Sequence, residues 1–280
     1  MPFLELFDET LDINSTENYE MALQVSSQQL SFCLLDSIRN KFVLLRSFDA
    51  GESKYLNADR INELLSKDDF LLKRYKKVHI LITSQKFTLI PSPLFDPAKK
   101  EEYFNFNHTT EDNNTIITNK LSDPDSFLVF SASKPVIDLL NSYYPVSHPN
   151  HHLKPLFNHI SFTRKSTNGN YIHIHVESDF FVLIIFNNNL LKFCNSFSYR
   201  NISDILYFTL KVFKTLDINQ EETVFFSGTT EKYDDIFSNF SIYIRGIKFA
   251  EPSGNFTFSY VFNETGLHRF LNLFNITNCE

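Results

Sequence analysis

Residues 171–228 hold the feature that most constrains the fold, because short β-rich runs there precede one amphipathic helix. Apolar side chains at three- and four-residue spacing predict a helix over 201–213, and an apolar run predicts a buried strand at 223–228. We expect a further helix after it and then a strand at 242–245. Breaks of only three residues between the first runs predict antiparallel hairpins. Those runs are 171–176, 180–186 and 190–194.

A similar order of elements occurs earlier in the chain. The apolar runs 29–35 and 41–47 predict a hairpin. Residues 57–65 predict a helix with Asn57 as its N-cap, and residues 77–83 predict a buried strand.

The repeated order predicts two lobes of similar topology, residues 1–165 and 166–280. We expect residues 19–25 to form an edge strand in the first lobe. The strand at 29–35 is predicted to correspond to the strand at 171–176 in the second.

Residues 85–125 predict an insertion in the first lobe, because prolines, charged residues and Asn- and Thr-rich stretches interrupt the pattern there. We expect the main sheet to resume at 126–131. A helix over 134–143 is predicted to follow, with Pro135 tolerated in its first turn.

Composition and charge exclude several classes of protein. The 280 residues include 31 Phe and 12 Tyr, and 42% of the chain is hydrophobic, which is typical of a globular protein rather than a disordered one. The formal net charge of −7 argues against binding to nucleic acid, although the basic runs 73–77 and 99–100 could contact a phosphate backbone.

The sequence also favours a cytoplasmic protein without a membrane segment. The first residues are acidic where a secretory signal is basic, and the longest apolar run, 180–186, is far shorter than the roughly 20 residues of a membrane helix. The three cysteines are widely spaced, which predicts neither a disulfide framework nor a structural zinc site.

Residues 171–186, 190–197, 201–213 and 223–230 resemble the second lobe of the pilus-assembly and cell-division actin homologues. Two lobes of this ribonuclease H-like topology resemble the actin, sugar kinase and Hsp70 superfamily. The whole chain resembles an uncharacterised Bacteroidetes family described as having an actin-like ATPase fold and no established function. The resemblance implies an α/β protein of two ribonuclease H-like lobes with an α/β insertion in the first.

In this superfamily, the turn between the first two strands of each lobe carries a phosphate loop, and a later glycine-rich turn holds adenosine. Glycine is needed because backbone N–H groups must approach the phosphates closely. By resemblance, the loops here are 36–41 and 177–180, which contain no glycine, and the later turn is 227–230. The candidate nucleotide-binding residues are Asp36, Ser37, Glu177, Ser178, Asp179, Ser227, Gly228 and Thr229.

Asp36 and Glu177 each end a strand, and two carboxylates facing each other across the cleft between the lobes could hold magnesium. The alternative is that both are ordinary acidic residues that close hairpins.

Histidines raise the question of metal sites at two places in the chain. His173 and His175 share one face of a strand, where they could bind a metal or face solvent or a helix. The other four histidines lie close to prolines, and their spacing matches no zinc-binding signature. For this stretch we expect a loop and no metal. These four are His148, His151, His152 and His159.

Loops without glycine lead us to expect a protein that is not an enzyme, needs no cofactor, and binds or scaffolds a protein partner on a degenerate actin-like fold. The alternative is a divergent nucleotide-binding protein or ATPase that uses ATP and magnesium. We also expect Ile38, Phe180 and Phe181 to narrow the cleft between the lobes where phosphates would lie.

Overall fold

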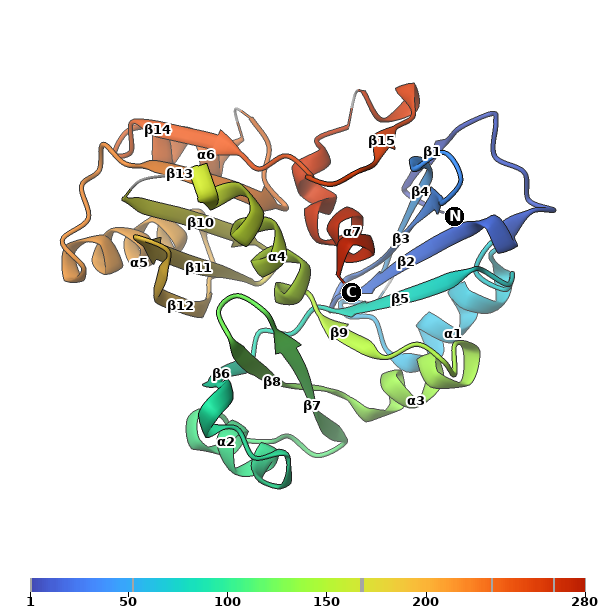
Figure 1. Cartoon of the computed structure of the whole chain (residues 1–280), viewed down its shortest axis with the longest axis horizontal. Helices are drawn as coiled ribbons and strands as arrows, with labels where there is room; N and C mark the ends of the chain where they lie inside the picture. The colour runs from blue at the N-terminus through green and yellow to red at the C-terminus, as the bar shows by residue number, and fades with distance from the viewer. Residues whose placement is uncertain (1, 52, 167–168, 233, 264, 280) are drawn as a thin grey trace. The chain divides into compact units, whose positions relative to one another are not determined.

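The computed structural model describes the whole chain except residues 1, 52, 167–168, 233, 264 and 280. The chain divides into two compact units (Figure 1). Unit 1 comprises Met1–Asn158, Gly254–Thr265 and Asn272–Glu280, and unit 2 comprises His159–Ser253 and Gly266–Leu271. The sequence-based division at residues 165 and 166 assigned the last two segments of unit 1 to the second lobe. The chain instead returns to unit 1 after completing most of unit 2.

Unit 1 is built on a seven-stranded sheet of order β1-β4-β3-β2-β5-β9, in which β15 also pairs with β4. β2, β3 and β4 are antiparallel neighbours, whereas β5 runs parallel to β2 and β9 runs parallel to β5. Two helices, α1 and α3, pack against each other beside this sheet. The strands are β1 (Leu4–Phe7), β2 (Tyr19–Val25), β3 (Gln29–Asp36), β4 (Lys41–Asp49), β5 (Lys77–Ile82), β9 (Pro149–His151) and β15 (Thr257–Phe258). The helices are α1 (Ala58–Lys67) and α3 (Lys134–Tyr143).

The central place of β2 shows that the prediction of an edge strand at 19–25 is wrong. Two polar residues interrupt the apolar pattern of β2, and both are hydrogen-bonded from within the sheet. Glu20 Oε2 lies 3.1 Å from His79 Nε2, and Gln24 Nε2 donates to Thr83 Oγ1 over 3.3 Å. Because β2 has the central position, it corresponds to the strand that begins unit 2. The predicted correspondence of 29–35 with 171–176 is therefore wrong by one strand.

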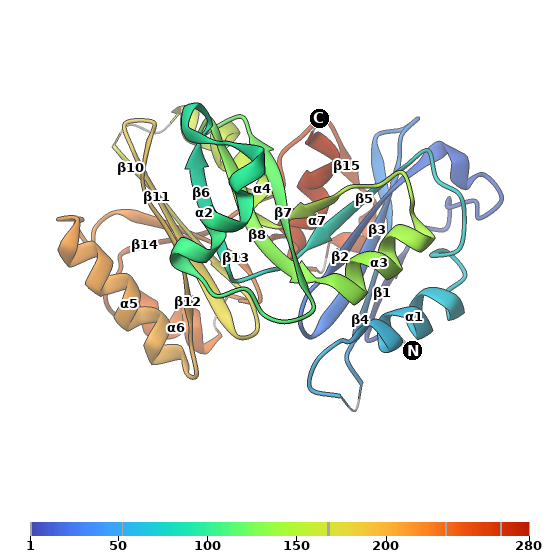
Figure 2. The same ribbon diagram turned by 90° about the horizontal axis from the view of Figure 1, so that it is seen from below.

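The insertion in unit 1 forms a separate three-stranded sheet of order β6-β8-β7, covered by α2 (Figure 2). Phe104 of α2 packs on Ile116 and Val129 to form its core. The prediction that residues 126–131 return to the main sheet is wrong, because β8 is the centre of this small sheet. An apolar run does not reveal which of two sheets will bury it. The elements are β6 (Phe87–Pro91), α2 (Lys100–Asn107), β7 (Asn114–Leu121) and β8 (Ser126–Ser133).

Unit 2 repeats the topology of the main sheet with the order β12-β11-β10-β13-β14. The predicted strands and helix of residues 171–228 are confirmed, but residues 242–245 form a turn, and the next strand begins at Gly246. A Cβ at that glycine would lie 2.7 Å from Thr223 Oγ1, so the close approach of β14 to β13 requires glycine. The strands are β10 (Asn170–Val176), β11 (Phe180–Asn187), β12 (Leu190–Ser198), β13 (Thr223–Gly228) and β14 (Gly246–Phe249). The helices are α5 (Ile202–Thr215) and α6 (Asp235–Ser241), and α4 (Leu153–Thr163) precedes β10.

Polar side chains cap the first turns of α1 and α5. Asn57 accepts a hydrogen bond from the N–H of Arg60 over 2.8 Å, which confirms the predicted N-cap of α1. Asn201 and Asp204 form a reciprocal capping box at α5, with distances of 3.1 and 3.2 Å. Among the described residues, no helix is both long and apolar enough to cross a bilayer.

The last segments of the chain complete the core of unit 1. The ring of Phe42 on β4 lies 5.3 Å from that of Phe258 on β15 and 4.9 Å from that of Phe274. Phe274 belongs to α7 (Leu271–Asn275) and is fully buried. A large aromatic cluster of unit 1 therefore joins residues that are more than two hundred positions apart in the sequence.

Candidate functional site

The predicted site residues of unit 2 gather where β10 and β13 end side by side. These strands are parallel, and Val176 is paired with Gly228. The Gly228 backbone has φ of +87°, and a Cβ there would lie 2.0 Å from the carbonyl oxygen of Val176, so no other residue fits. The N–H of Thr229 donates to that same oxygen over 2.8 Å, and the N–H of Thr230 donates to the Gly228 carbonyl over 2.8 Å. These two N–H groups of the turn are thus occupied within the chain.

The turn between β10 and β11 is closed in the same way. The N–H of Glu177 donates to the Phe180 carbonyl over 2.8 Å, and the Tyr199 hydroxyl donates to the Glu177 carbonyl over 2.6 Å. Ser178 is exposed and Asp179 is half-buried, whereas the side chain of Glu177 turns inward and is buried.

A chain of buried polar groups runs inward from Glu177. Glu177 Oε1 lies 3.0 Å from His175 Nε2, and the other ring nitrogen, His175 Nδ1, lies 2.8 Å from Ser227 Oγ. Ser227 Oγ also lies 2.8 Å from His173 Nε2. All four side chains are at most 7% exposed. We name this set, Glu177, His175, Ser227 and His173, the histidine relay.

The carboxylate assigns the protons along the histidine relay. An ionised carboxylate only accepts, so His175 donates from Nε2 to Glu177, and a singly protonated His175 then accepts at Nδ1. Ser227 then donates its hydroxyl proton to His175 and accepts one from His173 Nε2. The remaining nitrogen, His173 Nδ1, is an acceptor that has no hydrogen-bond partner among the described residues. In that arrangement the charge of Glu177 sets the direction of every hydrogen bond in the relay.

Burial lowers the pKa of two histidines of this region, His159 and His173. Burial lowers the pKa of His159 to about 4. Burial, with the nearby rings of His159 and His175, lowers the pKa of His173 well below its usual value. Burial raises the pKa of Tyr171, which precedes His173 on the same face of β10, to about 12. His173 and His175 are buried, so neither faces solvent. The ring of His173 lies 6.3 Å from that of His159 on α4, which agrees for His173 with the alternative that it faces a helix.

Ser227, His175 and Glu177 are the residue types of a hydrolase triad, but their placement does not suit one. Ser227 has no exposed surface, so no substrate can reach its oxygen. Nowhere in the described part of the chain do three or more His, Cys, Asp or Glu side chains gather so as to hold a metal ion. The histidine relay is therefore a structural network that joins β10 to β13.

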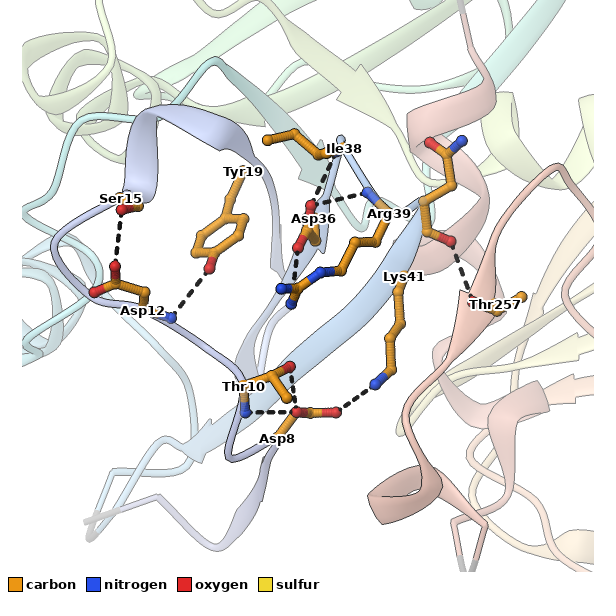
Figure 3. A network of polar contacts seen from close by, with 11 residues as sticks. Asp8, Thr10, Asp12, Ser15, Tyr19, Asp36, Ile38, Arg39, Lys41 and Thr257 are labelled. Carbon is orange, nitrogen blue, oxygen red and sulfur yellow. Dashed lines mark hydrogen bonds and ion pairs between the residues drawn. The ribbon is translucent and has the colours of Figure 1, made fainter.

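In unit 1, Asp36 is engaged in its own turn (Figure 3). Its Oδ1 accepts from the N–H groups of Ile38 and Arg39 over 2.9 and 3.0 Å, and the guanidinium of Arg39 lies 3.6 Å from Oδ2. Ser37 donates its N–H to the Asn18 carbonyl over 3.1 Å. Asp36 thus closes a hairpin, as the alternative interpretation predicts.

Asp36 and Ser37 also do not lie in the turn of unit 1 that is equivalent to residues 177–179 of unit 2. The first two strands in the order that unit 2 repeats are β2 and β3, so the turn equivalent to 177–179 is 26–28. Ser26 Oγ accepts there from the N–H groups of Gln28 and Gln29 over 3.4 and 3.0 Å. This turn has neither glycine nor a carboxylate. The pairing of Asp36 with Glu177 as equivalent positions is therefore a wrong premise, and magnesium binding by them remains untested.

Asp8 is a buried carboxylate that the sequence did not single out. Its Oδ2 lies 2.8 Å from Lys41 Nζ, and its Oδ1 accepts from both the N–H and the hydroxyl of Thr10 over 2.7 and 2.6 Å (Figure 3). Burial alone would raise the pKa of Asp8, but hydrogen bonds from Lys41 and Thr10 outweigh it and lower the pKa. The Asp-x-Thr spacing was the available signal for this turn.

The histidines expected in a loop lie instead in ordered, buried positions, apart from the exposed His148. His151 ends β9, its Nε2 lies 2.9 Å from the Ser84 carbonyl, and its ring is 4.7 Å from that of Phe130. His159 lies on α4, with Nδ1 3.0 Å from Ser253 Oγ. The loop prediction is wrong for these two residues.

The phenylalanines expected near the phosphates are buried within unit 2. Phe181 has no exposed surface and belongs to the core, where its ring lies 5.3 Å from that of Phe197. Phe180 is also buried, whereas Ile38 in unit 1 is 74% exposed. A narrowing of the space between the lobes by these side chains stays a prediction.

Solved structures similar to this chain define the class of fold. A crystal structure from Bacteroides thetaiotaomicron, of a protein with an actin-like ATPase fold and unknown function, matches with a TM-score of 0.77 and 24% identity. The match covers 86% of this chain and 93% of the other chain. The PilM-PilN type IV pilus biogenesis complex matches with a TM-score of 0.59 and 10% identity over 93% of this chain and 98% of the other. The ethanolamine utilization protein EutJ from Carboxydothermus hydrogenoformans matches with a TM-score of 0.51 and 8% identity over 91% and 89%.

The chain therefore has the actin-like ATPase fold that the sequence predicted. Residues 8–247 match the family described as protein of unknown function (DUF3822), and the chain belongs to that family. No curated protein sequence matches it.

Proposed function

We propose that this protein is a non-catalytic binding protein that uses an actin-like fold to hold a protein partner, without ATP turnover or a required cofactor. The observation that carries the proposal is that several polar groups at the turns of both units are hydrogen-bonded within the chain. The Glu177 carboxylate is hydrogen-bonded to His175, and the N–H of Thr229 donates to the Val176 carbonyl. In unit 1, the N–H groups of Gln28 and Gln29 donate to Ser26 Oγ. A phosphate would need such N–H groups free.

Two further observations support the proposal. The fold neighbour in the pilus biogenesis complex is a protein that assembles with another protein, PilN. Cys33, Cys194 and Cys279 are free thiols, which fits a reducing compartment, so we place the protein in the cytoplasm.

The alternative is a divergent nucleotide-binding protein that uses magnesium and ATP. It is favoured by the position of Glu177, Ser178, Asp179, Ser227, Gly228 and Thr229 at the carboxyl ends of β10 and β13. Ligands of open α/β sheets bind at such ends. The exposed Ser178 and half-buried Asp179 are the members best placed to meet a ligand. Asp36 and Ser37 would have to contribute from a turn that differs from the one the fold uses.

A thermal-shift titration with magnesium and ATP, ADP or GTP separates the two functions. A ligand specific to the folded state at about one hundred times its dissociation constant stabilises a protein by about 2.7 kcal/mol. We expect no saturable shift and no phosphate release.

The matched variants for this titration are Glu177→Gln, which keeps an oxygen facing His175 but removes the charge, and Glu221→Gln, at an exposed position of the same unit. A saturable rise in melting temperature that disappears in Glu177→Gln and persists in Glu221→Gln would establish the nucleotide-binding function instead.

A further inference from the structure

A short segment that belongs to unit 2 interrupts the return of the chain to unit 1. Residues 254–265 and 272–280 are parts of unit 1, whereas Gly266–Leu271 between them is part of unit 2. Most of this segment forms the 3₁₀ helix η6 (Leu267–Phe270), which packs against β13. We name Gly266–Leu271 the bridging segment, because one unit holds it while the other unit holds both of its flanks.

Two side chains attach the bridging segment to the turn that follows β13. His268 Nε2 lies 2.5 Å from the carbonyl oxygen of Thr230, and because a carbonyl only accepts, the imidazole donates. The guanidinium of Arg269 forms an ion pair with the carboxylate of Glu231. The ring of His268 also lies 4.3 Å from that of Phe249, the last residue of β14. The bridging segment thus lies at the carboxyl ends of β13 and β14, the side of an open α/β sheet where ligands bind.

The turn that receives these side chains is held by Asp234, the N-cap of α6. Asp234 Oδ2 accepts from the hydroxyl of Thr230 over 2.9 Å and from the N–H of Glu231 over 2.6 Å. Its Oδ1 accepts from the N–H of Phe237 over 2.6 Å. These bonds fix the backbone of Thr230 and Glu231 from within unit 2, so the turn offers the bridging segment a defined place of attachment.

The other end of the bridging segment runs directly into the core of unit 1. Leu271 follows η6 and begins α7, so no loop residue separates the two helices. Phe274 of α7 is fully buried, and its ring lies 4.9 Å from that of Phe258. The next element, η7 (Ile276–Asn278), packs beside β2 and β5. The burial of large apolar side chains therefore anchors this end in unit 1.

The contacts along the bridging segment are of unequal strength. The side chain of Arg269 is 37% exposed and that of Glu231 is 60% exposed, and ion pairs at such positions contribute little to stability. Phe270 and Leu271, next to α7, are by contrast buried. The attachment of His268 and Arg269 to the turn is therefore the part that opens first. Because a continuous helical run follows, we expect its movement to reach α7.

We propose that the bridging segment is a latch that closes the carboxyl end of β13 and transmits the state of that end to unit 1. While His268 and Arg269 stay on the turn, residues 272–278 are held in place. When these two side chains leave the turn, the end of β13 opens and residues 272–278 loosen. A ligand of unit 2 that competes for the Thr230 carbonyl or the Glu231 carboxylate would favour the open state and so act on unit 1.

Hydrogen–deuterium exchange of the full chain, read by mass spectrometry without an added ligand, tests the latch. Arg269→Glu places two carboxylates together, and Glu231→Arg in the same chain restores an ion pair with the charges reversed. His268→Phe keeps a ring beside Phe249 but removes the donor to Thr230.

The matched control is Arg245→Glu, which breaks an exposed ion pair of unit 2, that of Arg245 with Glu221 at 2.7 Å. We expect Arg269→Glu and His268→Phe each to speed amide exchange at both 229–231 and 272–278 by at least about threefold, and the control by less than about 1.5-fold. The charge-reversed double variant is expected to return both stretches to within about 1.5-fold of the unchanged chain.

The pattern of exchange decides between a latch and an ordinary surface contact. Faster exchange confined to residues 229–231 would refute the link to unit 1, and no change at either stretch would refute the latch. An equal effect of the control, a double variant that restores nothing, or a rise spread evenly over β10 and β11 would indicate a general loss of stability and would also overturn the proposal. Because no ligand is added, these outcomes are independent of whether the protein binds a protein partner or a nucleotide.

Discussion

Replacing Ser227 with alanine tests the histidine relay. The hydroxyl is fully buried and lies 2.8 Å from both His173 Nε2 and His175 Nδ1. Without it, a buried donor on one ring and a buried acceptor on the other lose their partners. A buried polar group left unsatisfied costs about 1 to 3 kcal/mol, so we expect Ser227→Ala to lower the free energy of unfolding by about 3 kcal/mol.

Urea unfolding at pH 7, followed by circular dichroism, measures this loss. Ser238→Ala, on the exposed face of α6, is the matched control and is expected to change stability by less than about 0.5 kcal/mol. His173→Phe removes the donor that Ser227 satisfies, so in the double variant the two losses are expected to be less than additive. A loss from Ser227→Ala as small as that of the control, or full additivity, would refute the relay.

Three further predictions concern stability. Burial lowers the pKa of His159 from 6.5 in the unfolded chain to about 4 in the folded protein, so the unfolded chain binds more protons between these values. The stability is therefore complete near pH 7 and declines as the pH falls from 6.5 to 4, and urea titrations at pH 7 and pH 5 are expected to show a smaller decline for His159→Gln. Gly228→Ala places a Cβ 2.0 Å from the Val176 carbonyl and is expected to cost about 3 kcal/mol or more in thermal unfolding, whereas Gly169→Ala, also at positive φ but with open space around it, is expected to cost about 1 kcal/mol. Asp8→Asn is expected to cost about 2 kcal/mol at pH 7, and because the folded carboxylate has a lowered pKa, its advantage over the variant is expected to shrink once the pH falls below 3.8; equal slopes against pH would contradict this.

Local patterns were sufficient to predict most elements of the fold. The runs at 171–176 and 180–186, separated by Glu177 to Asp179, form the expected hairpin. Asn201 and Asp204 fix the start of α5 because both capping groups lie within one turn of sequence. The errors concern sheet membership. β2 is central and β8 belongs to the small sheet, and both assignments depend on pairings with distant strands that an apolar run does not specify.

The candidate site was less accessible to prediction, for the same reason. His173 and His175 share a face of β10 by simple alternation, but their common partner, Ser227, is about fifty residues away and reaches them only through the register of β10 with β13. The hydrogen bonds that close the turns also depend on atomic positions that the sequence does not show. In the sequence, Ser26 is an ordinary polar turn residue. Only the structure shows that its hydroxyl oxygen accepts from the N–H groups of Gln28 and Gln29.

The return of the chain to unit 1 has a consequence for synthesis on the ribosome. Residues 1–158 emerge first, yet Phe42 lacks Phe258 and Phe274 until nearly the whole chain has been translated. Residues 159–253 of unit 2, by contrast, form a single stretch with its own core. Vectorial folding usually favours the amino-terminal domain. Here the core cluster of the later unit is translated before the aromatic cluster of the earlier one is complete, so unit 1 cannot finish folding first.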